Sequence, residues 1–261
     1  MRLNWRALVP ALLVLFVSSC FEKAPEYSPL PAIEFSNICF TEGINSSTTS
    51  AQDTLSLTLK FRDGDGNLGL SASGAQDNEF PYNEKYYYQK NADGTVTKVT
   101  RNTGSLVNYK DKRTNARYAN LPAFATPFNC SNWELIYTND KNPKPTDTLY
   151  FEYNPDHYNI FIDFLIKNND GTFTPYDFNK ASIYPNCPVS GFNGRFPILS
   201  TDPEKKSPLE GNINYKMKSF GLKLIFSIKT LKLRIRITDR ALNKSNELET
   251  PEFTLQSVNC N

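Results

Sequence analysis

Alternation of apolar and polar residues is the main pattern along this chain, and it predicts β-strands. Residues 53–61 (DTLSLTLKF) and 231–238 (LKLRIRIT) each place four apolar side chains on one face of an extended backbone, with polar or charged side chains on the other. The apolar residues are Leu55, Leu57, Leu59 and Phe61 in the first segment and Leu231, Leu233, Ile235 and Ile237 in the second. Both segments are typical of half-buried strands of a β-sandwich.

Residues 158–166 (YNIFIDFLI) differ, because they are apolar on both faces and therefore predict a central strand. Few windows keep apolar residues at helical spacing for three turns, and seventeen prolines punctuate the chain. The pattern as a whole predicts an all-β fold built as an antiparallel sandwich.

Two short segments resemble each other: KNADGTVT at 90–97 and KNNDGTFT at 167–174 share six of eight residues. Each holds Asp-Gly between β-rich flanks, where glycine supplies the positive φ of a tight hairpin turn. Convergent turn chemistry explains the likeness more simply than duplication does, although a true repeat stays open.

The carboxy-terminal segment 233–255 (LRIRITDRALNKSNELETPEFTL) resembles the closing strand pair of bacterial immunoglobulin-like and fibronectin-like domains. The likeness rests on an Asp-x-x-x-Asn-x-Ser turn formed by Asp239, Asn243 and Ser245, in which Leu242 stands where the family usually has glycine. With the segment DTLSLTLKFRDGDGNLG, the chain resembles Bacteroidetes-type outer-membrane lipoproteins with an immunoglobulin-like sandwich domain. This resemblance predicts a sandwich from residues 32–74 and 206–261, with 75–205 as a strand-rich insertion or second subdomain.

The amino-terminal 19 residues have the order of a secretory signal, with Arg2 and Arg6, an apolar run at 7–17, and small residues before Cys20. The run holds Pro10 and is too short to span a bilayer, which takes about 20 apolar residues. We therefore expect an exported chain, with residues 1–19 removed.

The sequence VSSC at 17–20 resembles the lipobox of bacterial lipoproteins, and this resemblance implies cleavage before Cys20 and attachment of palmitate and other acyl chains to it. A plain signal with a chance cysteine is the alternative. In well-studied Gram-negative lipoproteins, an aspartate directly after the lipidated cysteine resembles an inner-membrane retention signal. This chain has Phe21 at that position, so the analogy favours the cell outer membrane. Residues 20–31 hold three prolines and are typical of a semi-rigid tether.

Removal of the signal changes the charge balance, because two of the 29 basic side chains lie in it, leaving 27 basic against 27 acidic residues. Zero net charge gives no support to a nucleic-acid partner. The charge is uneven, since residues 205–244 hold eleven Lys or Arg and the two acids Glu210 and Asp239.

Four cysteines besides Cys20 suit an oxidising compartment. Of three possible connectivities we favour Cys39 with Cys260, which would tie the first strand to the last, and Cys130 with Cys187. Four free buried thiols are the alternative, and the spacing matches no zinc pattern.

The segment DGDGN places Asp63, Asp65 and Asn67 at alternate positions, the spacing with which a curled loop surrounds Ca²⁺. The rest of an EF-hand loop is missing, since Leu68 and Gly74 stand where glycine and a bidentate glutamate belong. The alternative is a glycine-rich turn in which Asp and Asn cap their own backbone.

Two further surfaces suggest binding. The cationic stripe Lys232, Arg234 and Arg236 is a candidate site for an anionic partner such as a glycan, or else a solvated edge strand. Rings gather at 86–88 and 150–153 and at Trp133, where they either stack on sugars or a protein partner or pack a core.

Enzymatic activity has little support, because the chain lacks the common catalytic motifs and its single histidine is His157 in PDHYN. We therefore predict a membrane-anchored, non-enzymatic binding or accessory module of the cell envelope that docks on an outer-membrane protein complex or holds a glycan or peptide. The second hypothesis is a calcium-stabilised structural sandwich without a ligand of its own, and the third is a hydrolase using Asp156 or His157.

Overall fold

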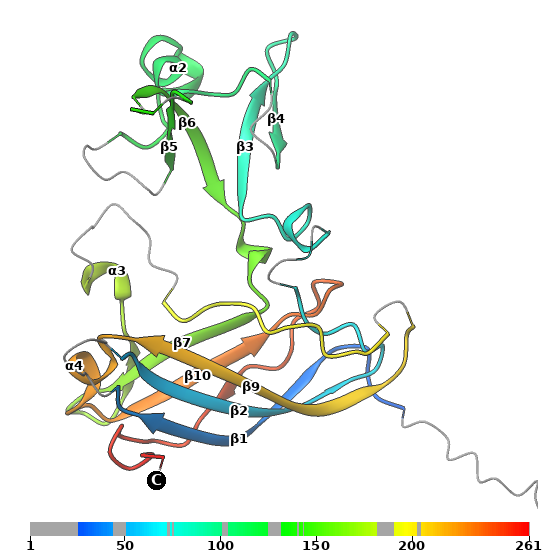
Figure 1. The fold of residues 1–261 in the computed structure, drawn as a ribbon, viewed down its shortest axis with the longest axis vertical. Helices are drawn as coiled ribbons and strands as arrows, with labels where there is room; N and C mark the ends of the chain where they lie inside the picture. Colours follow the sequence, from blue (N-terminus) through cyan, green and yellow to red (C-terminus); the bar gives the residue numbers. More distant parts are fainter. Residues whose placement is uncertain are drawn as a thin grey trace, which may run out of the picture.

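The computed structural model forms three antiparallel sheets (Figure 1), which confirms the predicted all-β antiparallel sandwich. Two of the sheets pack into the sandwich, and the third stands apart as a subdomain. The structure describes residues 26–43, 51–71, 74, 76–100, 104–124, 132–139, 141–142, 144–181, 191–202 and 205–260.

The first sandwich sheet has the order β1-β2-β9. It is formed by β1 (Ala32–Thr41), β2 (Asp53–Asp63) and β9 (Leu209–Ser219). The second sheet has the order β11-β10-β7-β8. It is formed by β7 (Ile160–Lys167), β8 (Phe173–Pro175), β10 (Leu231–Ile237) and β11 (Leu248–Glu249).

The sandwich core is formed by the apolar faces of the two sheets, where the predicted alternation holds at each named position. All eight apolar residues of the two alternating segments are at most 5% exposed. The doubly apolar segment is β7, which lies between β10 and β8 as a central strand should. Burial of each such side chain contributes about 1.5 to 3 kcal/mol, so these strands dominate the stability of the sandwich.

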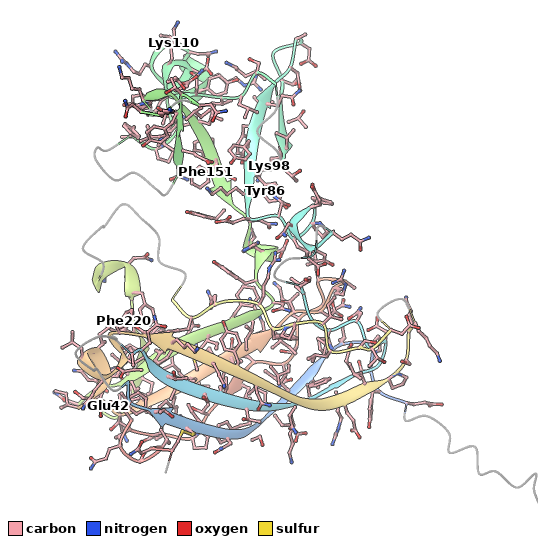
Figure 2. All side chains as sticks on the ribbon, in the orientation of Figure 1. Glu42, Tyr86, Lys98, Lys110, Phe151 and Phe220 are labelled. Carbon is pink, nitrogen blue, oxygen red and sulfur yellow. A yellow bond between two sulfur atoms is a disulfide. The ribbon has the colours of Figure 1, made fainter. Side chains whose placement is uncertain are left out.

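The subdomain sheet has the order β4-β3-β6-β5 and carries a small apolar cluster on each face. Its strands are β3 (Lys85–Lys90), β4 (Val96–Val99), β5 (Trp133–Tyr137) and β6 (Pro145–Tyr153). The helical turns α2 (Tyr109–Thr114) and η3 (Ala116–Tyr118) contribute to the cluster around Trp133. Figure 2 labels Tyr86 on β3 and Phe151 on β6, the two strands that lead down to the sandwich.

The segment that lies outside the sandwich is shorter than the predicted range 75–205. Strand β7 pairs with β10 and β8 pairs with β7, so both belong to the second sandwich sheet and the subdomain proper ends with β6. The sequence pattern misplaced this boundary because strand pairing across a long insertion leaves no local signal. The short helices η2 (Gln76–Asn78) and η4 (Pro155–His157) lie in the two connections between the sandwich and the subdomain.

The two similar segments form hairpin turns in different sheets, β3–β4 and β7–β8. In each turn the Asp side chain accepts a hydrogen bond from the backbone N–H two residues on, at 2.8 Å for Asp93 and 2.9 Å for Asp170. Gly94 and Gly171 have φ of 80° and 84°. The shared residues therefore encode one turn geometry.

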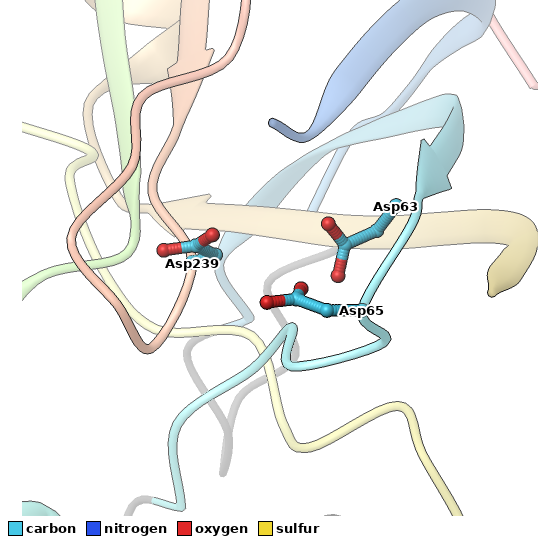
Figure 3. Close-up of side chains that lie close together, drawn as sticks. All are labelled: Asp63, Asp65 and Asp239. Atoms are coloured by element: carbon cyan, nitrogen blue, oxygen red, sulfur yellow. The ribbon is translucent and has the colours of Figure 1, made fainter. Parts of the chain in front are cut away.

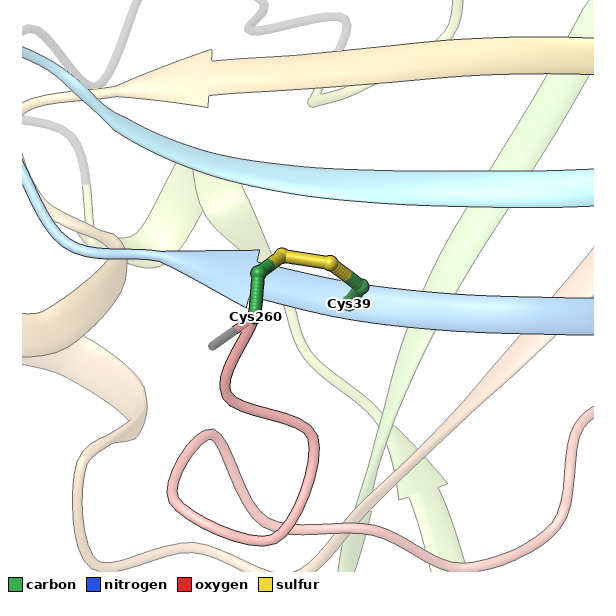
Figure 4. Close-up of a disulfide and its surroundings, with 2 residues drawn as sticks. All are labelled: Cys39 and Cys260. Atoms are coloured by element: carbon green, nitrogen blue, oxygen red, sulfur yellow. A yellow bond between two sulfur atoms is a disulfide. The ribbon is translucent and has the colours of Figure 1, made fainter.

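The predicted disulfide between Cys39 and Cys260 is present and joins β1 to the carboxy-terminal segment (Figure 4). Backbone hydrogen bonds support it, since Phe40 N donates to Val258 O at 2.7 Å and Cys260 N donates to Phe40 O at 2.8 Å. Cys20, Cys130 and Cys187 lie outside the described residues, so lipidation and the second pairing stay predictions. Within the described ranges, no helix has the length and apolar character needed to cross a bilayer.

Candidate metal centre

Asp63 is the last residue of β2, and strand alternation places it on the buried face. The period of two that buries Leu59 and Phe61 carries on to Asp63, whose exposure is 0%. A carboxylate in this position is removed from water and needs a cation or hydrogen-bond donors to offset the loss of hydration.

The loop after Asp63 curls so that Asn67 faces back toward the strand end. Asn67 N donates to Asp63 Oδ2 at 2.9 Å, and Asn67 Nδ2 donates to Asp65 Oδ2 at 3.0 Å. Gly66 has φ of 66°, and a Cβ there would lie 2.3 Å from Ser207 O, so glycine is required. The loop thus brings the three predicted ligand residues Asp63, Asp65 and Asn67 together.

Asp239 reaches the same place from the other sheet, because it lies two residues beyond the end of β10. It is 3% exposed and organises its own turn. Its Oδ1 accepts from Ala241 N at 2.8 Å and Asn243 N at 2.7 Å, and its Oδ2 accepts from Asn243 Nδ2 at 2.8 Å. Leu242 has φ of 64°, a left-handed conformation that favours glycine.

Figure 3 shows the carboxylates of Asp63, Asp65 and Asp239 directed toward one another. One oxygen of each lies within 4.8 Å of an oxygen of the other two. Three buried oxygens at this point accept no hydrogen bond from the described residues, namely Oδ1 of Asp63, Oδ1 of Asp65 and Oδ1 of Asn67. Because Asn67 Nδ2 is bonded to a carboxylate, its amide is oriented with Oδ1 as the free acceptor.

Electrostatics disfavour this cluster when all its carboxylates are charged. Burial, followed by the charge of Asp65, raises the pKa of Asp63 to about 7. Burial also raises the pKa of Asp239. A bound divalent cation would reverse this balance, since it replaces the lost hydration and neutralises two of the three charges.

The donor set consists of oxygen atoms, which suits a hard cation. Three carboxylates and one amide give Ca²⁺ at least four side-chain ligands, and backbone oxygens or water complete its usual six to eight. The sequence indicated three of the four residues. Asp239 was named only for its turn, because sequence spacing does not show that the strands before Asp63 and Asp239, which belong to different sheets, end at the same place.

Arg240, next in the chain, is bonded away from the three carboxylates. Its Nη1 lies 2.8 Å from Asp77 Oδ1. Its guanidinium lies over the Tyr82 ring, with 5.7 Å between Cζ and the ring centroid. Its backbone N donates to Asn67 O at 3.1 Å, and its backbone O accepts from Tyr82 Oη. The metal-site loops are therefore joined to the segment that leads into β3.

His157 lies in the junction between sandwich and subdomain. Its Nδ1 is 3.0 Å from Tyr82 O and 2.8 Å from Arg195 Nη2. Arg195 also donates to His157 O at 2.6 Å and to Tyr82 O at 2.6 Å. His157 therefore helps to hold the junction together through its contacts with Tyr82 and Arg195.

The cationic stripe lies on β10, a strand flanked by β7 and β11. Lys232 and Arg234 both pair with Glu249, at 3.5 Å and 3.1 Å, and Arg236 lies over the Phe161 ring at 4.8 Å. Glu249 thus pairs with two of the three cations, and the Phe161 ring lies beside the third, while the use of the stripe as an anion site stays a prediction.

The aromatic clusters of the subdomain are mostly interior. Trp133, Tyr150 and Phe151 are at most 6% exposed, whereas Tyr153 is 43% exposed. Most of these rings pack the two small cores, and the surface available for stacking on a sugar is correspondingly small.

Comparison with known proteins gives the chain no relatives. No family model, no curated protein and no solved structure matches it.

Proposed function

We propose that this chain is a lipid-anchored, non-enzymatic module of the bacterial cell envelope whose sandwich binds Ca²⁺ at Asp63, Asp65, Asn67 and Asp239. The observation that carries the calcium part is the set of three buried oxygens without a donor, beside three carboxylates within 4.8 Å of one another. Buried polar atoms are normally satisfied, so an unpaired group of this kind calls for a ligand.

The position of the ion explains what it does for the fold. Asp63 ends a strand of the first sheet and Asp239 follows a strand of the second, so Ca²⁺ at this point ties the two sheets together. The disulfide acts at the opposite end, because Ala32 pairs with Arg62 next to the metal site while Cys39 pairs with Ser56. Metal and disulfide would together close both ends of the sandwich.

The accessory role is supported by the architecture. The subdomain sheet projects from the sandwich on two connections that are held by Arg195, Arg240 and His157 (Figure 1). A projecting sheet on a rigid, anchored base suits docking on an outer-membrane complex or binding a glycan. The lipid anchor itself rests on the lipobox resemblance at Cys20.

The calcium part is tested by calorimetric titration of the metal-stripped protein. The wild type should bind one Ca²⁺ per chain, and Asp65→Asn should lose most of the heat because it removes a charged ligand. Asp93→Asn is the matched control, since Asp93 is an exposed carboxylate in the β3–β4 turn of the subdomain, away from the centre. Equal binding by the wild type and Asp65→Asn would refute this site.

The anchor is tested separately by palmitate labelling in cells. The wild type should take up label and Cys20→Ala should not. Label that survives the substitution would refute the anchor and leave the calcium site untouched.

A further inference from the structure

One end of the sandwich carries three exposed large apolar side chains, which we call the apolar tip: Phe220, Leu224 and Ile228. They are 65%, 86% and 89% exposed, respectively. They come from α4 (Leu222–Phe226) and the turns that flank it. Figure 2 shows Phe220 at this end, and Figure 1 shows α4 there.

The apolar tip is held firmly although its side chains are exposed. The opposite side of α4 inserts Leu222 and Phe226, 1% and 0% exposed, into the sandwich core. Leu224 lies in α4 itself, and Phe220 and Ile228 lie in the turns directly before and after it, so the three exposed side chains flank one short helix. Exposed apolar groups fixed on a rigid support are typical of an interaction surface.

Lysines flank the tip. Residues 216–229, which enclose it in the sequence, contain four lysines and no Asp or Glu. Lys216 and Lys218 are exposed on β9 beside α4, and Lys223 pairs with Glu42. Apolar side chains rimmed by lysines match a bilayer with anionic headgroups, because the rings and aliphatic groups enter the acyl region while the ammonium groups stay at the phosphates.

The tether reaches far enough for this contact. Strand β1 starts at Ala32, where the tether ends, and runs to Thr41, next to the Glu42 that contacts α4. Its 10 residues span about 34 Å. A chain of the length from Cys20 to Pro31 spans at most about 40 Å when extended. A sandwich anchored through Cys20 can therefore lie lengthwise along a bilayer and touch it with the tip.

We propose that Phe220, Leu224 and Ile228 insert into an anionic lipid surface and give the protein a second membrane contact. This inference rests on the proposed lipid anchor, which holds the tip near the membrane. Two contacts at opposite ends fix the orientation of the sandwich, whereas one acyl anchor leaves it free to rotate. The subdomain stands on the long side between these ends (Figure 1).

The test uses the acylated full chain in vesicles of phosphatidylcholine and phosphatidylglycerol that contain a lipid with a photoreactive acyl chain. After illumination, mass spectrometry should find lipid adducts on residues 220–228. The double variant Leu224→Asp with Ile228→Asp should lose these adducts and keep its palmitate. Phe80→Asp is the matched control, because Phe80 is 72% exposed at the base of the subdomain and should leave the adducts unchanged.

Absence of adducts on residues 220–228 in palmitoylated protein would overturn the membrane contact. Pure phosphatidylcholine vesicles should give fewer adducts than the anionic ones. Absence of palmitate would instead mean failure of the anchor. The unacylated protein would then be added to the same vesicles, where adducts on the tip support the contact and their absence refutes it.

Discussion

Arg240 Nη1 lies 2.8 Å from Asp77 Oδ1, and this ion pair joins the residue after a proposed calcium ligand to the segment that leads into the subdomain. The Asp77 side chain is 3% exposed and that of Arg240 is 23% exposed. Removal of one partner leaves the other charge largely out of water, which makes this pair more important than those on the surface.

Asp77→Asn should therefore lower the free energy of unfolding in urea by about 2 to 4 kcal/mol. Arg240→Gln in the same chain should recover part of this loss, with a coupling of about 1 to 3 kcal/mol. Glu252→Gln serves as control, since its pair with Lys167 is 37% and 44% exposed and should contribute less than about 1 kcal/mol. Additive effects of the two junction variants would contradict the pairing.

The His157 junction should weaken in acid. Burial lowers the pKa of His157 below its usual value, and the charge of Arg195 adds to this shift, although the hydrogen bond with the Tyr82 backbone and the charge of Glu84 oppose it. The unfolded chain therefore binds a proton more readily than the native state, so stability is present at and above neutral pH and is lost as pH falls below about 6.5. Thermal unfolding between pH 8 and 5 should show a steeper fall for the wild type than for His157→Gln, and parallel curves would refute the assignment.

Leu242 occupies a left-handed conformation at φ of 64°, which costs a residue with a Cβ about 1 to 2 kcal/mol. Leu242→Gly should thus be at least as stable as the wild type in urea, despite the lost side chain. A side chain branched at Cβ raises the cost of the left-handed conformation further, so Leu242→Val should be less stable than the wild type by about 1 to 2 kcal/mol. The reverse order would show that side-chain packing, not backbone conformation, decides this position.

The Cys39–Cys260 disulfide closes a loop across a sequence separation of 221 residues. Loop entropy then predicts that the paired variant Cys39→Ser with Cys260→Ser loses up to about 5 kcal/mol of unfolding free energy. Reductant should destabilise the wild type and leave the paired variant much less affected. Equal stability without reductant would mean that backbone hydrogen bonds alone hold this end.

Local alternation was enough to predict the strands that form the core. Leu57 and Ile235 each obey the period of two, and the doubly apolar segment lies between β10 and β8, with Asp163 exposed on its outer face. The Asp-Gly turns also followed from local chemistry, which needs no knowledge of distant contacts. The pairing of Cys39 with Cys260 followed instead from the expectation that it ties the first strand to the last.

Long-range features escaped prediction for a physical reason. Asp239 joins Asp63 because two strands from different sheets end at the same place, which sequence spacing cannot encode. The β7–β10 pairing, which moved the subdomain boundary, is of the same kind. The alternation in β10 predicts exposed cations. In the structure Arg234 pairs with Glu249 and Arg236 lies over the Phe161 ring, and no local pattern predicts these contacts.

The most direct test of the calcium centre is thermal unfolding of the wild type and Asp63→Asn, each with Ca²⁺ and with chelator. Calcium at a hundredfold excess over its dissociation constant should stabilise the wild type by about 2.7 kcal/mol. In chelator, Asp63→Asn should melt above the wild type because a buried charge is gone, and calcium should leave it unchanged. A wild-type melting temperature that neither calcium nor chelator moves, or a variant that responds as the wild type does, would contradict the account.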